Sequence, residues 1–255
     1  MGLLKTVSSG GLQTLLLARP EVRNALNGPL IAELTAAFTA LPGTAKAVLL
    51  AGEGPAFCSG ADAEWMKRSR TFTREENERD AASLSALLQA VDDCPVPVVG
   101  RIHGVALGGG AGLAAACDIV VAEEGTQFGF PEVRLGLVPA VISTYVLPRI
   151  GPGAARRYFL TGERFGPTEA RALGLVHEVA PAGTLDARVQ AIISELLKGG
   201  PLALRAAKRL IHNAGRLSRD HAREEMTRLI AEIRITPEAQ EGLSAFLEKR
   251  KPNWP

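Results

Sequence analysis

Three consecutive glycines, Gly108 to Gly110, constrain the fold of this 255-residue chain more than any other feature. A short β-branched run that begins after Pro97 precedes them, and the helix-like stretch 111–116 follows them. Glycine allows close backbone approach, and a helix that opens on such a turn presents unpaired N–H groups. The pattern predicts a helix N-terminus that binds an acceptor oxygen or a phosphate. A tight turn or a close helix–sheet crossing explains the glycines alone equally well.

Apolar spacing predicts alternating strands and helices through the first two thirds of the chain. The apolar runs 3–8 and 12–18 flank Gly10-Gly11, which is typical of a β-hairpin. The charged run 68–80 predicts an exposed and mobile segment. Helices are predicted over 30–41, 81–91, 141–150, 154–160 and 168–173, and strands over 46–51 and 176–179.

From Leu185 onward the pattern is helical, with breaks at 199–201, 215 and 236–237. Strands and helices first, followed by helices alone, predict one α/β core with a helical C-terminal region. We expect the core to span 1–195 and the helical region to span 196–255.

Composition narrows the class of protein. The net charge of +2 is too small to favour nucleic acid or an anionic membrane as a partner. No apolar run reaches membrane-spanning length, and the first residues lack the pattern of a signal peptide, so a cytoplasmic location is expected. Three irregularly spaced cysteines, Cys58, Cys94 and Cys117, indicate reduced thiols and no disulfide framework.

Several familiar catalytic patterns are missing. The sequence has neither a G-x-S-x-G elbow nor a Walker A motif, and the four histidines lack metal-ligand spacing, so no metal site is predicted. Cys58 lies beside a glycine turn, where a buried structural thiol is more common than a nucleophile. The segment 110–115 fits G-x-G-x-x-A with Glu132 twenty residues on, which leaves a dinucleotide site as a weak alternative because the position along the chain is unusual.

A second glycine turn at Gly60 and one acidic residue in an apolar frame, Glu132, favour a different site. In such a site two backbone N–H groups bind a developing oxyanion while a carboxyl group moves protons. The chain here resembles the enoyl-CoA hydratase/isomerase (crotonase) family along nearly its whole length. The motifs that carry the resemblance are 19–26 (RPEVRNAL), 57–62 (FCSGAD), 104–110 (GVALGGG), 117–119 (CDI), 128–132 (FGFPE), 241–242 (EG) and 245–250 (AFLEKR).

The resemblance implies an α/β fold with a crotonase-like ββα spiral core and a C-terminal helical trimerisation region. It places the oxyanion donors at the N–H groups of Ala61 and Gly109 and the acid/base at Glu132. It implies an acyl-CoA substrate, no separate cofactor, and assembly as a homotrimer or a dimer of trimers. The positions that it assigns to substrate and CoA are Arg23, Ala25, Ala61, Asp62, Ala63, Glu64, Gly108, Gly112, Phe246 and Lys249, the last two often contributed by a neighbouring subunit. Helix packing is an equally good interpretation of Phe246.

One position departs from the family pattern. Hydratases of the family typically use two glutamates, and the first falls at Gly112. A single Glu132 is compatible with hydration of a 2-enoyl-CoA and with the shift of a 3-enoyl-CoA to a 2-enoyl-CoA. A non-enzymatic acyl-CoA-binding protein is a third alternative.

The segments 132–136, 139–143 and 156–161 are most similar to bacterial methylglutaconyl-CoA and isohexenylglutaconyl-CoA hydratases, which favours hydration. We expect the missing side chain at Gly112 to leave room for water or a branched acyl group. On that basis Gly112→Glu should fold and should favour linear substrates.

Overall fold

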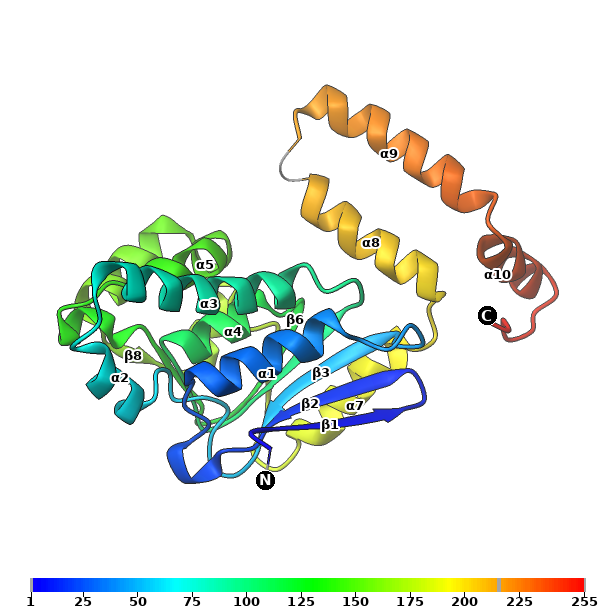
Figure 1. Ribbon diagram of the computed structural model, residues 1–255. Helices are drawn as coiled ribbons and strands as arrows, with labels where there is room; N and C mark the ends of the chain where they lie inside the picture. The colour runs from blue at the N-terminus through cyan, green and yellow to red at the C-terminus, as the bar shows by residue number, and fades with distance from the viewer. Residues whose placement is uncertain (1, 215–216, 255) are drawn as a thin grey trace.

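The computed structural model describes residues 2–214 and 217–254, and a six-stranded sheet forms the centre of its core (Figure 1). The strand order is β1-β2-β3-β4-β6-β9, with β1 and β2 antiparallel and all later neighbours parallel. The predicted hairpin is therefore confirmed. The strands are β1 (Leu4–Ser9), β2 (Leu12–Leu17), β3 (Ala47–Gly52), β4 (Val98–Ile102), β6 (Ile119–Glu123) and β9 (Glu178–Ala180).

A smaller sheet carries the turn that organises the chain. It contains β5 (Val105–Leu107), β7 (Gln127–Gly129) and β8 (Arg164–Phe165), with β5 parallel to β7. Gly104 turns the chain from β4 into β5 with a φ of 64°, and a Cβ there would lie 2.0 Å from the Pro55 carbonyl oxygen. Only glycine fits such a turn, which sends the next residues into the second sheet.

Alternating apolar residues build two cores on opposite faces of the large sheet. Val98 and Ile102 belong to the larger cluster, while Val99 packs with α7, because successive strand residues point to opposite faces. Figure 1 shows α1, α3 and α4 over one face and α7 against the other. The helices of this part are α1 (Gly28–Thr39), α2 (Ala63–Ser69), α3 (Arg74–Asp92), α4 (Gly109–Ala116), α5 (Ala140–Thr161), α6 (Pro167–Ala172) and α7 (Leu185–Leu196), with short 3₁₀ turns η1 (Pro20–Val22) and η2 (Pro131–Leu135).

Two helices show where sequence patterning succeeded and failed. The predicted break in α5 is confirmed at Gly151, whose φ is 69°. The segment 68–80 is mostly exposed, as predicted, but the helix predicted over 81–91 starts within this segment, because α3 already begins at Arg74. Thr73 accepts a hydrogen bond from the Glu76 N–H, and the Glu76 carboxylate accepts one from the Thr73 N–H. This capping box satisfies two N-terminal donors and starts the helix within a charged sequence.

The C-terminal helices α8 (Pro201–Ala214), α9 (Arg219–Arg234) and α10 (Pro237–Leu247) extend away from the core (Figure 1). The buried Glu238 carboxylate accepts hydrogen bonds from the first N–H groups of α8, those of Leu202 and Ala203. Such a carboxylate satisfies orphan donors and the positive end of the helix dipole. The break predicted at 236–237 is confirmed, and the break predicted at Gly215 lies outside the described residues. Within the described ranges, every helix is too short or too polar to cross a bilayer.

Candidate active site

Three chain segments run parallel and end at one edge of the small sheet. Cys58 forms a parallel bridge with Ala106 of β5, through hydrogen bonds of 3.1 Å from Cys58 N to Val105 O and from Leu107 N to Cys58 O. On its other side β5 pairs with β7. Because the carboxyl ends of parallel strands meet at one edge, the residues that follow each segment lie together. Those residues include the predicted Ala61, Gly109 and Glu132.

The Ala61 N–H faces this edge. Leu26 N donates to Gly60 O over 2.7 Å and Asp62 N donates to Leu26 O over 2.9 Å, so Leu26 pairs with the residues on either side of Ala61. Because Leu26 bonds the residues before and after Ala61, Ala61 directs its own N–H away from Leu26. Gly60, with a φ of 95°, has no room for a side chain, since a Cβ would lie 2.8 Å from Leu107 O. The turn is therefore pressed against the end of β5.

A buried polar network fixes the Ala61 turn. Arg19 Nη2 lies 2.8 Å from Asp62 Oδ2, and the Asp62 side chain also caps α2 through the Trp65 N–H. Burial alone would raise the pKa of Asp62, but the Arg19 and Trp65 hydrogen bonds outweigh burial and lower it. Asn24, fully buried at a φ of 56°, donates to the carbonyl oxygens of Glu53 and Ala56. Sequence reasoning missed these supporting roles, although Arg19 and Asn24 both lie in the first motif.

The second donor is the N–H of Gly109, the first residue of α4. Gly108 adopts φ 50° and ψ −120°, and its N–H donates to Gly129 O over 2.9 Å. This turn directs the first N–H groups of α4 out of the small sheet, where helix geometry leaves them without partners. Among the described residues, no acceptor bonds the N–H of either Ala61 or Gly109. Both are available to a ligand oxygen.

Glu132 lies directly against the glycine turn. It occupies the first turn of η2, three residues after β7, and a Cβ on Gly108 would lie 2.9 Å from its Oε1 atom. Its Oε2 atom is buried and has no hydrogen-bond partner among the described residues. Burial therefore raises the pKa of Glu132. A carboxyl group with a raised pKa next to two free donors is suited to take up and return a proton.

This raised pKa predicts a pH-dependent stability difference between the wild type and Glu132→Gln. In the unfolded chain the carboxyl ionises near its ordinary pKa of 4.5, whereas in the folded protein it keeps its proton to a higher pH. Stability is therefore lost as pH rises through that window. We expect the Gln variant to melt above the wild type at pH 8, and the difference to vanish at pH 4.5. A difference in melting temperature that stays constant from pH 4.5 to 8 would contradict the assignment.

The expected space at Gly112 does not exist. A Cβ there would lie 2.4 Å from Cγ2 and 2.9 Å from Cβ of Ile142, which α5 places on α4. Ile142 is only 3% exposed, so its side chain fills the volume that we expected to hold water or a branched acyl group. Gly112→Glu is accordingly expected to clash unless Ile142 moves, contrary to the prediction that it folds readily. No signal in one sequence pairs residues thirty positions apart.

The predicted CoA-binding positions near the Ala61 turn divide into an exposed group and a buried group. Arg23, Ala63 and Glu64 are exposed around the Ala61 turn, as contact with a ligand requires. Ala25 and Asp62 are buried, and their carbonyl and carboxylate oxygens accept hydrogen bonds from Arg19.

Phe246 lies in the last turn of α10 and Lys249 follows that helix, and Figure 1 shows α10 far from α2. Phe246 is 80% exposed, so the helix-packing interpretation does not hold within one chain.

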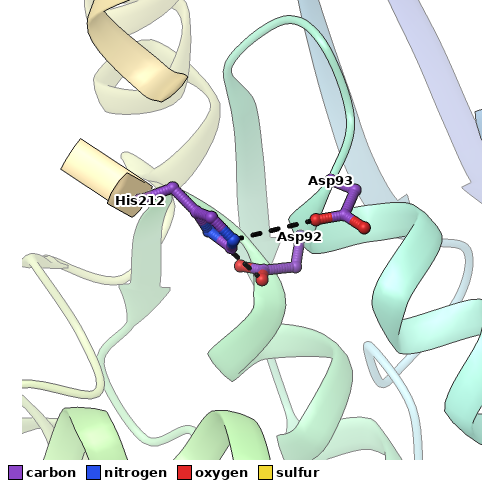
Figure 2. Close-up of side chains that lie close together, drawn as sticks. All are labelled: Asp92, Asp93 and His212. Atoms are coloured by element: carbon purple, nitrogen blue, oxygen red, sulfur yellow. Dashed lines mark ion pairs between the residues drawn. The ribbon is translucent and has the colours of Figure 1, made fainter. Parts of the chain in front are cut away.

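Outside this site, Figure 2 shows His212 of α8 beside Asp92 and Asp93 at the end of α3. His212 Nδ1 lies 3.6 Å from Asp92 Oδ2, and its Nε2 lies 3.9 Å from Asp93 Oδ1. Because the two ring nitrogens face different carboxylates, the ring bridges them and ties α8 to α3.

The three cysteines lie in the protein interior, where thiols usually serve packing. Cys58, Cys94 and Cys117 are buried and unpaired. Burial raises the pKa of Cys58 to about 12, so this thiol stays protonated near neutral pH, which favours the structural interpretation over a nucleophile.

Known proteins match this chain over nearly its whole length. The family model for enoyl-CoA hydratase/isomerase matches residues 8–255. The chain is 33% identical to the 2,3-dehydroadipyl-CoA hydratase of Escherichia coli, over 94% of this chain and 93% of that protein. It is 33% identical to an enoyl-CoA isomerase/hydratase of Mycosarcoma maydis, over 95% and 92%.

Solved structures extend the likeness to the fold. The crystal structure of an enoyl-CoA hydratase from Shewanella pealeana superposes with a TM-score of 0.93 at 36% identity, covering 99% of this chain and 96% of that one. This match confirms the predicted α/β crotonase fold with C-terminal helices. The chain therefore belongs to the enoyl-CoA hydratase/isomerase family of enzymes.

Proposed function

We propose that this enzyme adds water across the double bond of a 2-enoyl-CoA to give a 3-hydroxyacyl-CoA. The observation that carries the proposal is the meeting of two free backbone donors, at Ala61 and Gly109, with the half-buried carboxyl group of Glu132. The thioester oxygen binds between the two N–H groups, which stabilise the negative charge that develops on it.

Glu132 moves the proton. As carboxylate it accepts a proton from water while the water oxygen bonds to C3, and the π electrons of the C2=C3 bond pass to the thioester as an enolate. The resulting carboxylic acid returns the proton to C2, which regenerates the carboxylate. One group serves as base and acid on the same face, so the addition is syn.

A second candidate is the shift of a 3-enoyl-CoA to a 2-enoyl-CoA. The Ile142 side chain on Gly112 favours it, because no second carboxylate is available there to hold water. Glu132 would remove the proton from C2 and deliver it to C4 of the dienolate, again between the same donors. The substrate of this reaction differs from that of hydration only in the position of one double bond.

One assay separates the two reactions. Purified enzyme is incubated with trans-2-hexenoyl-CoA and with trans-3-hexenoyl-CoA, and the absorbance of the conjugated thioester is followed. We expect loss of absorbance with the 2-enoyl compound. A rise with the 3-enoyl compound alone would replace hydration by isomerisation as the main activity, and no change with either would leave an acyl-CoA-binding protein.

Substrate class and assembly extend this proposal. A branched acidic acyl group is supported by the resemblance of 132–136, 139–143 and 156–161 to methylglutaconyl-CoA and isohexenylglutaconyl-CoA hydratases, and not by space at Gly112, which Ile142 fills. Apolar side chains exposed on the C-terminal helices support assembly as a homotrimer or a dimer of trimers, because exposed apolar patches favour contact between subunits. The exposed set is Leu202, Leu210, Ile211, Ile230, Ile235, Leu243, Phe246 and Leu247. Sedimentation analysis of the full chain measures the state directly.

A further inference from the structure

Glycines leave two positions at the start of α4 without a side chain, and neighbouring side chains cover both. Gly108 precedes the helix and Gly112 lies in its first turn, where its N–H donates to Gly108 O over 3.0 Å. The Glu132 carboxylate covers the first glycine and the Ile142 side chain covers the second.

Ile142 places an apolar side chain over Gly112, the residue whose N–H bonds the Gly108 turn that Glu132 covers. The α5 helix that carries Ile142 packs against both α4 and η2, so it touches the helix of the donor and the turn of the carboxylate. The Glu132 Oε2 atom has no partner among the described residues, and Ile142 offers no hydrogen-bonding atom. A water molecule at this turn gains no hydrogen bond from the Ile142 side chain, whereas ordered buried water usually has about three partners.

We propose that Ile142 is the specificity-determining residue of this site, which sets the ratio of hydration to double-bond migration. By filling the space over Gly112, it withholds a second hydrogen-bonding group from the attacking water. Both reactions use the same oxyanion donors and the same carboxylate, so they differ mainly in whether water is held at C3. The inference rests on the proposed function and deepens it.

The sharpest test changes the polarity of the side chain at position 142 while it keeps the shape the same. Ile142→Thr and Ile142→Val have nearly the same branched shape, and only Thr adds a hydroxyl group beside the site. For each variant, kcat/KM is measured with trans-2-hexenoyl-CoA for hydration and with trans-3-hexenoyl-CoA for isomerisation, with products separated by chromatography. We expect the hydration-to-isomerisation ratio of the Thr variant to exceed that of the Val variant by about tenfold, the lower end of single-group effects in a pocket.

A pH profile gives a readout that a purely structural role would not move. A hydroxyl group that hydrogen-bonds the carboxylate, directly or through water, stabilises the charged form and lowers the pKa of Glu132. The acidic limb of kcat/KM should therefore move to lower pH in Ile142→Thr and stay in place in Ile142→Val.

A second matched pair covers the case in which Ile142→Thr does not fold. Ile142→Ala empties the space over Gly112. A second substitution in the same chain then refills the space from α4: Gly112→Ser adds a hydroxyl group and Gly112→Ala does not. The Ser double variant should show the higher hydration ratio, by the same reasoning.

The outcomes separate the inference from the function on which it rests. A wild type that turns over neither substrate overturns the proposed function. A wild type that is active, with equal ratios and equal pH profiles within the folded matched pairs, overturns the role of Ile142 and leaves the proposed function standing.

Discussion

Glu132→Gln is expected to lower kcat/KM for 2-enoyl-CoA by about 10² to 10⁴-fold, the usual contribution of a positioned acid/base. The amide has almost the same shape as the half-buried carboxyl group but neither accepts nor returns a proton. Folding should be preserved, because Oε2 has no hydrogen-bond partner to lose among the described residues. Steady-state kinetics at pH 7 to 8, where the wild-type carboxyl is most ionised, measures the loss.

Glu75→Gln provides the control, since it makes the same chemical change at an exposed position in the first turn of α3. This variant should keep wild-type rates. If Glu132→Gln retained more than about a tenth of the wild-type kcat/KM, Glu132 would not be the acid/base.

Ala61→Pro is expected to lower kcat by about 10² to 10³-fold while acyl-CoA affinity falls much less. The substitution deletes one N–H that is aimed at charge present mainly in the transition state. Binding of 3-hydroxyhexanoyl-CoA, the product of the assay reaction, is measured by calorimetry beside the kinetics. Equal losses of affinity and rate would show that the donor serves binding and not catalysis.

Ala61→Ser is the matched control, because it alters the exposed side chain and keeps the backbone donor. We expect it to retain most of the activity. Proline also restricts the turn that Arg19 and Asp62 hold, so melting curves of both variants must accompany the assays. A Pro variant that melts with the wild type and turns over substrate normally would remove Ala61 from the oxyanion site.

Local patterning determined most of the secondary structure. Gly10-Gly11 between two apolar runs led to the hairpin, and the helical spacing of Leu30, Leu34 and Phe38 led to α1, whose buried face contains those residues. Such patterns work because they depend on neighbours within one or two turns of chain. Reasoning from local pattern also misled us at 68–80. The charged residues there gave no sign of a helix, whereas the capping box at Thr73 starts α3 within this segment.

The motifs also located the chemistry but not its assembly. A glycine turn predicts free N–H groups wherever it occurs, and the motif around Glu132 predicts an acidic group in an apolar frame. Only the pairing of β5 with β7 on one side and with Cys58 on the other brings Ala61, Gly109 and Glu132 to one edge. Those contacts join residues tens of positions apart, and their register follows from sheet packing.

Gly112 shows the limit most clearly. The sequence by itself determined that a side chain is missing there, together with the fold class and the lone carboxyl group. Tertiary structure decided what replaces that side chain, because α5 lays Ile142 onto α4 and closes the space. Close packing leaves few voids in a protein interior, so an absent side chain is filled by whichever neighbour the fold brings near. The identity of that neighbour depends on helix–helix geometry, which a single sequence does not display.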